Sequence, residues 1–180
     1  MNLDTEIANY ESLTSHLIGK AIKKVSYFEI DYGEPTFEQS DHHSLDYGLQ
    51  LETDNGEAYY MIWDSQYFQY DLKFKRGPLR QELNPDAKIS CHDVSESNYW
   101  SDRVGQKLKS IRSYWSYVMT DGKPNKKYYP QDIELTFENG LSVVVSAIEI
   151  RQDGQVSGMA DHISVFFDSE TAKKYGAKNE

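Results

Sequence analysis

Two short clusters in the sequence combine residue types that ligate metals or act as nucleophiles. Neither cluster has the spaced cysteines and histidines that are typical of zinc sites, and adjacent residues rarely converge on one ion. A shared site would require two loops to bring His42 and His92 together. A nucleophilic Cys91 would need a base in reach, and a sequence neighbour in an extended segment usually points away. We therefore expect no metal site, no cofactor and no catalytic cysteine. The two clusters are Asp41-His42-His43 and Cys91-His92-Asp93.

Other catalytic patterns are missing from the sequence as well. Carboxylate pairs perform glycoside and acid–base chemistry, but among 29 acids some close pairs are inevitable, so the acids carry no signal. The glycines stand singly rather than in a phosphate-binding loop. Residues 154–158 lack the Gly-x-Ser-x-Gly order of a serine-hydrolase elbow. These absences predict a protein that is not an enzyme.

The most distinctive part of the sequence is residues 25–72, which contain eleven acids and eleven aromatic residues but no Lys or Arg. Alternation along strands lets about half of the aromatic residues face a core, so the others lie among carboxylates. Aromatic anchors surrounded by acids suit a binding site for a basic protein. The alternative is a solvated sheet face with tyrosines as good strand formers. The residues expected to contact a partner are Asp31, Tyr32, Glu34, Asp41, Asp46, Tyr47, Tyr60, Asp64 and Tyr67.

The composition restricts the class of partner. With 19 Lys plus Arg against 29 Asp plus Glu, the formal net charge is −10. A nucleic-acid binder needs a basic footprint, so we expect no nucleic-acid partner. No apolar run approaches the roughly 18–20 residues of a membrane helix, and the acidic N-terminus differs from a secretory signal. With a single cysteine, these features predict a cytoplasmic protein that has no membrane partner.

Short elements must position these residues. Apolar side chains three and four residues apart predict a helix over residues 5–17, with Asp4 or Thr5 as its cap. A second short helix is expected to begin after Asp168 or Ser169. The sequence thus predicts an α+β fold, mainly antiparallel β-sheet with short N- and C-terminal helices, in one domain of residues 1–180. The predicted strands are residues 22–30, 49–53, 58–63, 67–74, 133–137, 141–147 and 162–167.

Two pieces of the sequence recur in the same order. Residues 105–111 echo residues 19–25, and residues 133–140 echo residues 49–56, each pair about 85 positions apart. Both hairpins contain Asn-Gly, whose residues tolerate the positive φ of a tight turn. This predicts an internal repeat of residues 17–76 and 103–168, joined by a polar linker at residues 80–101. The alternative is that any two amphipathic hairpins look alike.

The unit formed by residues 104–111 and 132–140 resembles bacterial immunity proteins, small cytosolic inhibitors that neutralise a cognate toxin. The resemblance covers about a quarter of the chain and carries over no functional residue. Small size and acidity fit this class. The resemblance implies a non-enzymatic inhibitor that binds and occludes a toxin domain, and the acidic, aromatic-rich surface suggests that this domain is basic.

A second interpretation comes from another class of protein. A carbohydrate- or small-molecule-binding β-module, with or without hydrolase activity, would use Trp63, Trp100 or Trp115 to stack on a sugar ring. A deep pocket that holds a tryptophan beside two acids would favour this interpretation, and a shallow acidic face would favour the inhibitor. A third interpretation is an adaptor protein without a defined ligand.

Overall fold

A computed structural model describes residues 2–119 and 126–178. Two sheets and two short helices make up most of the fold, which confirms the predicted α+β class with mainly antiparallel sheet. The elements are α1 (Leu3–Ser15), β1 (Ile22–Ile30), β2 (His43–Leu45), β3 (Gly48–Thr53), β4 (Ala58–Asp64), β5 (Asp71–Arg76), the 3₁₀ turn η1 (Leu79–Gln81), β6 (Ile89–Asp93), β7 (Leu108–Met119), β8 (Lys126–Phe137), β9 (Ser142–Ser146), β10 (Ile148–Ile150), β11 (Val156–Gly158), β12 (Ile163–Phe166) and α2 (Ser169–Lys174).

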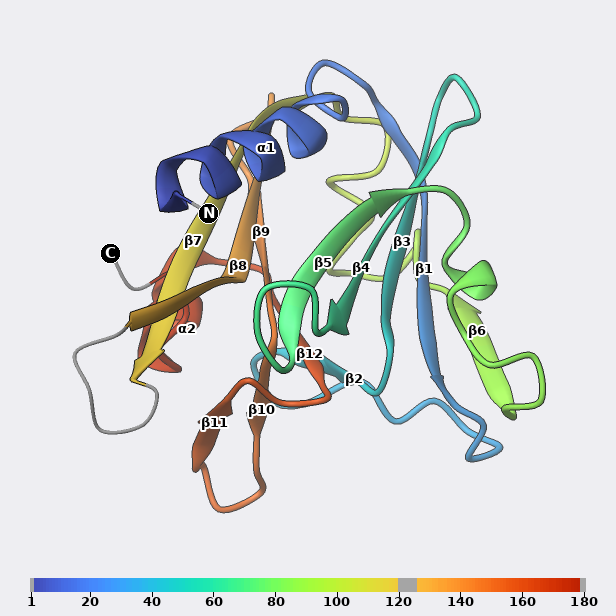
Figure 1. Ribbon diagram of the computed structural model, residues 1–180. Helices are drawn as coiled ribbons and strands as arrows, with labels where there is room; N and C mark the ends of the chain where they lie inside the picture. The colour runs from blue at the N-terminus through green and yellow to red at the C-terminus, as the bar shows by residue number, and fades with distance from the viewer. Residues whose placement is uncertain (1, 120–125, 179–180) are drawn as a thin grey trace.

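Two five-stranded antiparallel sheets form the body of the protein (Figure 1). The first sheet has the order β5-β4-β3-β1-β6 and the second has the order β2-β12-β9-β8-β7, while β10 and β11 form a separate ribbon. Apolar side chains from both sheets make one buried cluster, to which Tyr27 and Leu51 contribute from the first and Leu135 and Val145 from the second. Burial of this apolar surface is the main stabilising contribution to such a fold.

Each sheet also buries part of its outer face. Phe28, Tyr60 and Ile62 of the first sheet pack against Leu79 and Leu83 from the segment around η1. On the second sheet, a further buried cluster combines residues of β9 and β12 with residues of α2. As a result, β1 and β4 are buried on both faces instead of alternating between core and solvent.

The strands of the two predicted repeats are arranged in the same order within their sheets. In the first sheet β1, β3, β4 and β5 lie side by side, in the order that β7, β8, β9 and β12 take in the second. Reciprocal hydrogen bonds join the two starts: the Gly19 amide donates to the Leu108 carbonyl at 2.8 Å, and the Gly105 amide donates to the Ile22 carbonyl at 2.7 Å. This arrangement is the one that a duplication would produce, and the duplication itself stays a prediction.

The stretch expected to be a polar linker, residues 80–101, is an integral part of the fold. Within it, β6 pairs with β1 at the edge of the first sheet. Trp100 is fully buried, and its indole nitrogen donates a hydrogen bond of 2.6 Å to the Tyr27 hydroxyl. An edge strand pairs along one edge only and leaves its other edge in water, so it needs few apolar residues. For this reason the composition of β6 resembles that of a loop.

Both predicted helices form, with a small difference at the first cap. Asn2, rather than Asp4 or Thr5, caps α1 and accepts a hydrogen bond from the Asp4 amide at 3.2 Å. Asp168 caps α2 as predicted, and its side chain accepts from the Thr171 amide at 2.7 Å. Neither helix is long and apolar enough to cross a membrane.

The strand predicted over residues 67–74 begins later than expected, because residues 67–70 make a turn. The Asp71 carboxylate accepts hydrogen bonds from the backbone amides of Tyr67 and Phe68 and closes that turn. Tyr70 takes a positive φ of 57°, a conformation that few residues other than glycine adopt. Hydrogen bonds to this buried side chain therefore hold the backbone in a turn, although the aromatic residues themselves favour a strand.

Candidate functional site

The acid-rich connection between β1 and β3 crosses from one sheet to the other. It leaves β1, pairs as β2 with β12 at the edge of the second sheet, and returns to the first sheet as β3. In Figure 1 this connection runs along the lower part of the protein, from the lower end of β1 through β2 to β3. Since each end is held by a sheet, the carboxylates that it carries have defined positions.

Four carboxylates of this connection, here called the acidic rim, lack a Lys or Arg partner. They belong to Asp31, Glu34, Glu38 and Asp46. Across residues 2–119 and 126–178, no Lys or Arg nitrogen lies within ion-pair distance of these four groups. Only a histidine comes near, with His162 Nε2 at 3.7 Å from Asp46 Oδ1. The rim therefore concentrates unneutralised negative charge at one end of the molecule.

Some other acids of residues 25–72 are paired in space, with bases that lie outside that stretch of sequence. Lys73 Nζ lies 3.0 Å from the Asp64 carboxylate. Lys174 Nζ lies 2.8 Å from Asp41, and Lys174, followed by His42, lowers the pKa of Asp41 to about 2. The bases come from β5 and α2, so the negative surface is smaller than the sequence predicted.

A hollow of about 420 Å³, here called the rim hollow, opens between the acidic rim and the start of β12. Tyr32 is 57% exposed there. Partial burial, and then the neighbouring Asp46 carboxylate, raise the pKa of Tyr32. The Ile30 amide donates to Asp46 Oδ2 at 2.9 Å and fixes that carboxylate. The residues that line the rim hollow are Tyr32, Thr36, Gln39, Ser44, Asp46 and His162.

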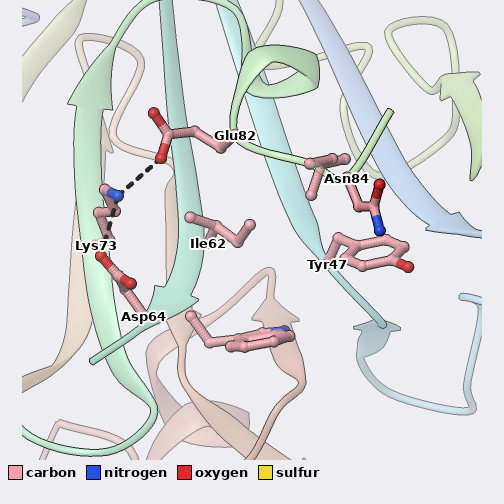
Figure 2. A pocket seen from close by; sticks show the side chains of 8 residues that line it. Tyr47, Ile62, Asp64, Lys73, Glu82 and Asn84 are labelled. Atoms are coloured by element: carbon pink, nitrogen blue, oxygen red, sulfur yellow. Dashed lines mark hydrogen bonds and ion pairs between the residues drawn. The ribbon is translucent and has the colours of Figure 1, made fainter. Parts of the chain in front are cut away.

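A second hollow of about 250 Å³, here called the Trp63 hollow, lies where β4 and β5 meet the segment after η1 (Figure 2). Figure 2 shows Lys73 between two carboxylates, with Nζ 3.0 Å from Asp64 and 2.9 Å from Glu82. Hydrogen bonds from Lys75 and then Lys73 lower the pKa of Glu82 to about 2. The lining residues are Tyr47, Ile62, Trp63, Asp64, Lys73, Glu82, Leu83 and Asn84.

The charges of the Trp63 hollow limit its chemistry. Glu82 is held ionised by two lysines, so it cannot serve as a proton donor near neutral pH. Asp64 is also paired with Lys73. The hollow does place a tryptophan beside two acids, the arrangement expected to favour the second interpretation. The acidic rim is the feature expected of the inhibitor, and the two features occupy different hollows.

The structure separates the nine predicted contact residues. Tyr32 and Asp46 line the rim hollow, and Tyr47 and Asp64 line the Trp63 hollow. Asp31 and Glu34 are exposed on the connection that carries the rim.

Three of the predicted contact residues do not offer a free side chain. Tyr60 is only 1% exposed beneath the segment around η1, so its predicted contact with a partner is wrong. Tyr67 is half-buried, with its ring edge-on to Tyr10 and Trp115. Asp41 is tied to α2. The prediction assumed an open outer sheet face, which the fold covers at β4.

Several lining residues were not predictable from the sequence. His162 reaches the rim hollow because β12 pairs with β2, and no pattern in the sequence signals that pairing. Glu82 and Asn84 belong to the stretch expected to be a linker. Lys73 was visible only as the first of a group of bases that follows the acidic stretch.

The two clusters first considered for metal or nucleophile chemistry serve other contacts. His43 is fully buried, with Nδ1 3.0 Å from the Tyr27 hydroxyl. His92 Nε2 lies 3.4 Å from Glu29. Partial burial raises the pKa of the Cys91 thiol, which lowers the thiolate fraction. In the described part of the chain, no three His, Cys, Asp or Glu side chains are grouped to hold a metal ion.

Comparison of this chain with protein families, with curated proteins and with solved structures finds no match. Function is therefore inferred from the acidic rim and from the two hollows. The rim offers four carboxylates without a Lys or Arg partner among the described residues, and the Trp63 hollow offers an aromatic surface beside paired charges. Each of these features favours a binding role.

Proposed function

We propose that this protein is a non-enzymatic, immunity-type inhibitor that binds a basic bacterial toxin domain through its acidic rim and occludes that domain. One observation carries the proposal: the four rim carboxylates lack Lys or Arg partners in the described structure, whereas Asp41 and Asp64 are paired. Solubility alone is served by charges of both signs interspersed over the surface. Like charges gathered at one end repel each other, and a basic partner would relieve that repulsion.

The rim hollow supports the same proposal. Tyr32 provides an exposed aromatic anchor, and anchors of this kind carry much of the affinity of protein interfaces. Thr36, Gln39 and Ser44 add hydrogen-bonding groups around it. A concave, acidic site with one exposed ring suits a protruding basic side chain of the partner. Occlusion of a toxin's active site in the cytoplasm would need no chemistry from the inhibitor.

Co-expression tests this proposal. Each reading frame next to the native gene would be induced in a sensitive bacterial host, alone and together with this chain. We expect one neighbour to arrest growth and this chain to relieve the arrest. The rescue should disappear with the rim variant Asp31→Lys/Glu34→Lys/Glu38→Lys.

A matched control separates the rim from net charge. The variant Glu11→Lys/Glu96→Lys/Glu138→Lys changes the charge by the same amount at exposed positions elsewhere, and it should still rescue growth. The proposal would be refuted if no neighbour is toxic, or if both variants rescue equally.

A further inference from the structure

The Trp63 hollow has the size and chemistry of a site for one small ring. At about 250 Å³ it is smaller than the roughly 300–1,000 Å³ of sites that hold drug-sized ligands. Ile62 and Leu83 provide apolar surface, while Tyr47 and Trp63 add aromatic rings. We propose that this hollow binds a neutral pyranose ring, as a ligand site separate from the acidic rim. The inference does not depend on the inhibitor function.

The charges of the hollow favour a neutral ligand over a charged one. Lys73 bridges Asp64 and Glu82, and Lys75 makes a second contact with Glu82 at 2.8 Å, so two positive charges match two negative charges. A charged ligand would find each charge of opposite sign already paired and each charge of its own sign nearby, so it would gain little net attraction. A neutral polyol can accept from the ammonium groups and donate to the free lone pairs of the carboxylates without breaking either pair.

The apolar and aromatic surfaces match the other half of a sugar ring. A pyranose carries hydroxyl groups around its edge and C–H groups on its faces, so it needs polar partners at the sides and an apolar surface below. Tryptophan and tyrosine provide such surfaces in binding sites. The other two tryptophans cannot serve, because Trp100 is fully buried and Trp115 packs against the core.

The side chains of the hollow are held in place from outside it. Trp63 Nε1 donates to the Asp46 carbonyl at 2.8 Å, and the ring of Tyr70 lies edge-on to its indole at 5.6 Å. The Asp86 amide donates to Asn84 Oδ1 at 3.0 Å, which fixes the Asn84 amide group. Rigid lining groups lose little conformational freedom when a ligand binds, so even a small ligand can gain affinity.

One hydrogen-bonding group of the hollow is left for a ligand. Within residues 2–119 and 126–178, the Asn84 Nδ2 group has no hydrogen-bond partner, while Asn84 Oδ1 accepts from the Asp86 amide. Figure 2 shows the Asn84 amide nitrogen turned toward Tyr47. A donor of this kind beside an aromatic surface can recognise a ring hydroxyl.

Solution NMR tests the site with defined probes. The methyl glycosides of glucose, galactose, mannose and N-acetylglucosamine would be titrated at millimolar concentrations into the ¹⁵N-labelled chain. The indole N–H signal of Trp63 is assigned with Trp63→Phe. We expect at least one glycoside to shift this signal in a saturable way and to leave the Trp100 signal unchanged. The absence of any saturable shift at Trp63 overturns the proposal.

Variants and charged probes complete the test. Asn84→Ala should weaken binding about fivefold, as expected for one lost hydrogen bond, whereas the exposed control Asn98→Ala should leave it unchanged. Equal binding by both variants contradicts the proposal. Tighter binding of glucuronate or glucosamine than of the methyl glucoside also contradicts it and points to a charged side chain of a protein partner as the occupant.

Discussion

The indole Nε1 of Trp63 donates a hydrogen bond of 2.8 Å to the backbone carbonyl of Asp46. Trp63 lines one hollow and Asp46 lines the other, so this bond joins the two candidate sites. It also holds the end of the acid-rich connection against β4. A change at Trp63 is therefore expected to reach the acidic rim.

Trp63→Phe should lower the free energy of unfolding because the smaller ring buries less apolar surface. It should lower it by about 1 kcal/mol more because the Asp46 carbonyl loses its hydrogen-bond donor. Urea denaturation measures the difference. Trp115→Phe is the matched control, since its indole bond of 3.3 Å reaches Ser113, only two residues away. Equal losses of stability in the two variants would show that the bond to Asp46 contributes no more than the local bond of Trp115.

His43 should keep a neutral ring over most of the pH range. Trp100 Nε1 donates to the Tyr27 hydroxyl, so that hydroxyl donates in turn to His43 Nδ1, where a proton would have to bind. Burial, and then the neighbouring His42, lower the pKa of His43 to about 4. NMR of the histidine rings, with His43 assigned by His43→Phe, measures this pKa directly. Titration of His43 near its ordinary value of about 6.5 would contradict the prediction.

The low pKa of His43 has a consequence for stability. Because the folded-state pKa lies below the unfolded value, the neutral ring contributes stability that is present above pH ~6.5 and lost as the pH falls toward ~4. The loss should be about 3 kcal/mol and should destabilise β2, which carries the rim connection. His43→Phe should flatten this part of the stability profile, and His16→Gln, at an exposed position, should not.

Asp132 should make the stability of the fold depend on pH in the opposite direction. It is buried, and its carboxylate accepts from the Ser146 hydroxyl and from the Lys178 amide, the latter at 2.8 Å. Burial raises its pKa to about 6. Since the folded-state pKa lies above the unfolded value of about 3.9, stability falls as the pH rises from ~4 to ~6, by about 3 kcal/mol.

Asp132→Asn removes this titration and keeps the size of the side chain. The difference in unfolding free energy between the variant and the natural chain should therefore grow in favour of the variant as the pH rises from ~4 to ~7. Chemical denaturation at several pH values measures it, with the exposed Asp153→Asn as the control. A difference that stays constant with pH would contradict the prediction.

The local elements were predictable because local patterns determine them. β1 spans the predicted residues 22–30, where β-branched and aromatic residues lie between glycines. The cap of α2 at Asp168 was likewise readable from its position before the helix. In both cases the determining residues lie within a few positions of the element.

The candidate site was only partly predictable, because tertiary pairing builds it. β2 has three residues, and it forms because it adds to β12, more than a hundred positions away in the sequence. The pairing of Asp64 with Lys73 depends on the register of β4 against β5. The burial of Tyr60 depends on a segment that looked like a linker. A linear charge pattern therefore located the acidic rim but overestimated its extent.

The rim variant tests the electrostatic part of the proposed function. Asp31→Lys/Glu34→Lys/Glu38→Lys should slow association with the toxin domain by at least about tenfold at low salt, because complementary charge steers the encounter. Glu11→Lys/Glu96→Lys/Glu138→Lys is the control with the same change in net charge, and it should slow association far less. Stopped-flow fluorescence measures both association rate constants. Equal slowing by the two variants would assign the effect to net charge rather than to the rim.

The most direct test of binding through the acidic rim is the salt dependence of the association rate constant for the natural chain and the cognate toxin domain. The screening length falls from about 10 Å at 0.1 M salt to about 3 Å at 1 M, so steering by the rim should fade over this range. We expect the natural chain to lose rate steeply with salt and the rim variant to be nearly insensitive. The same salt dependence for both proteins, or none for either, would contradict the proposal that the rim is the binding surface.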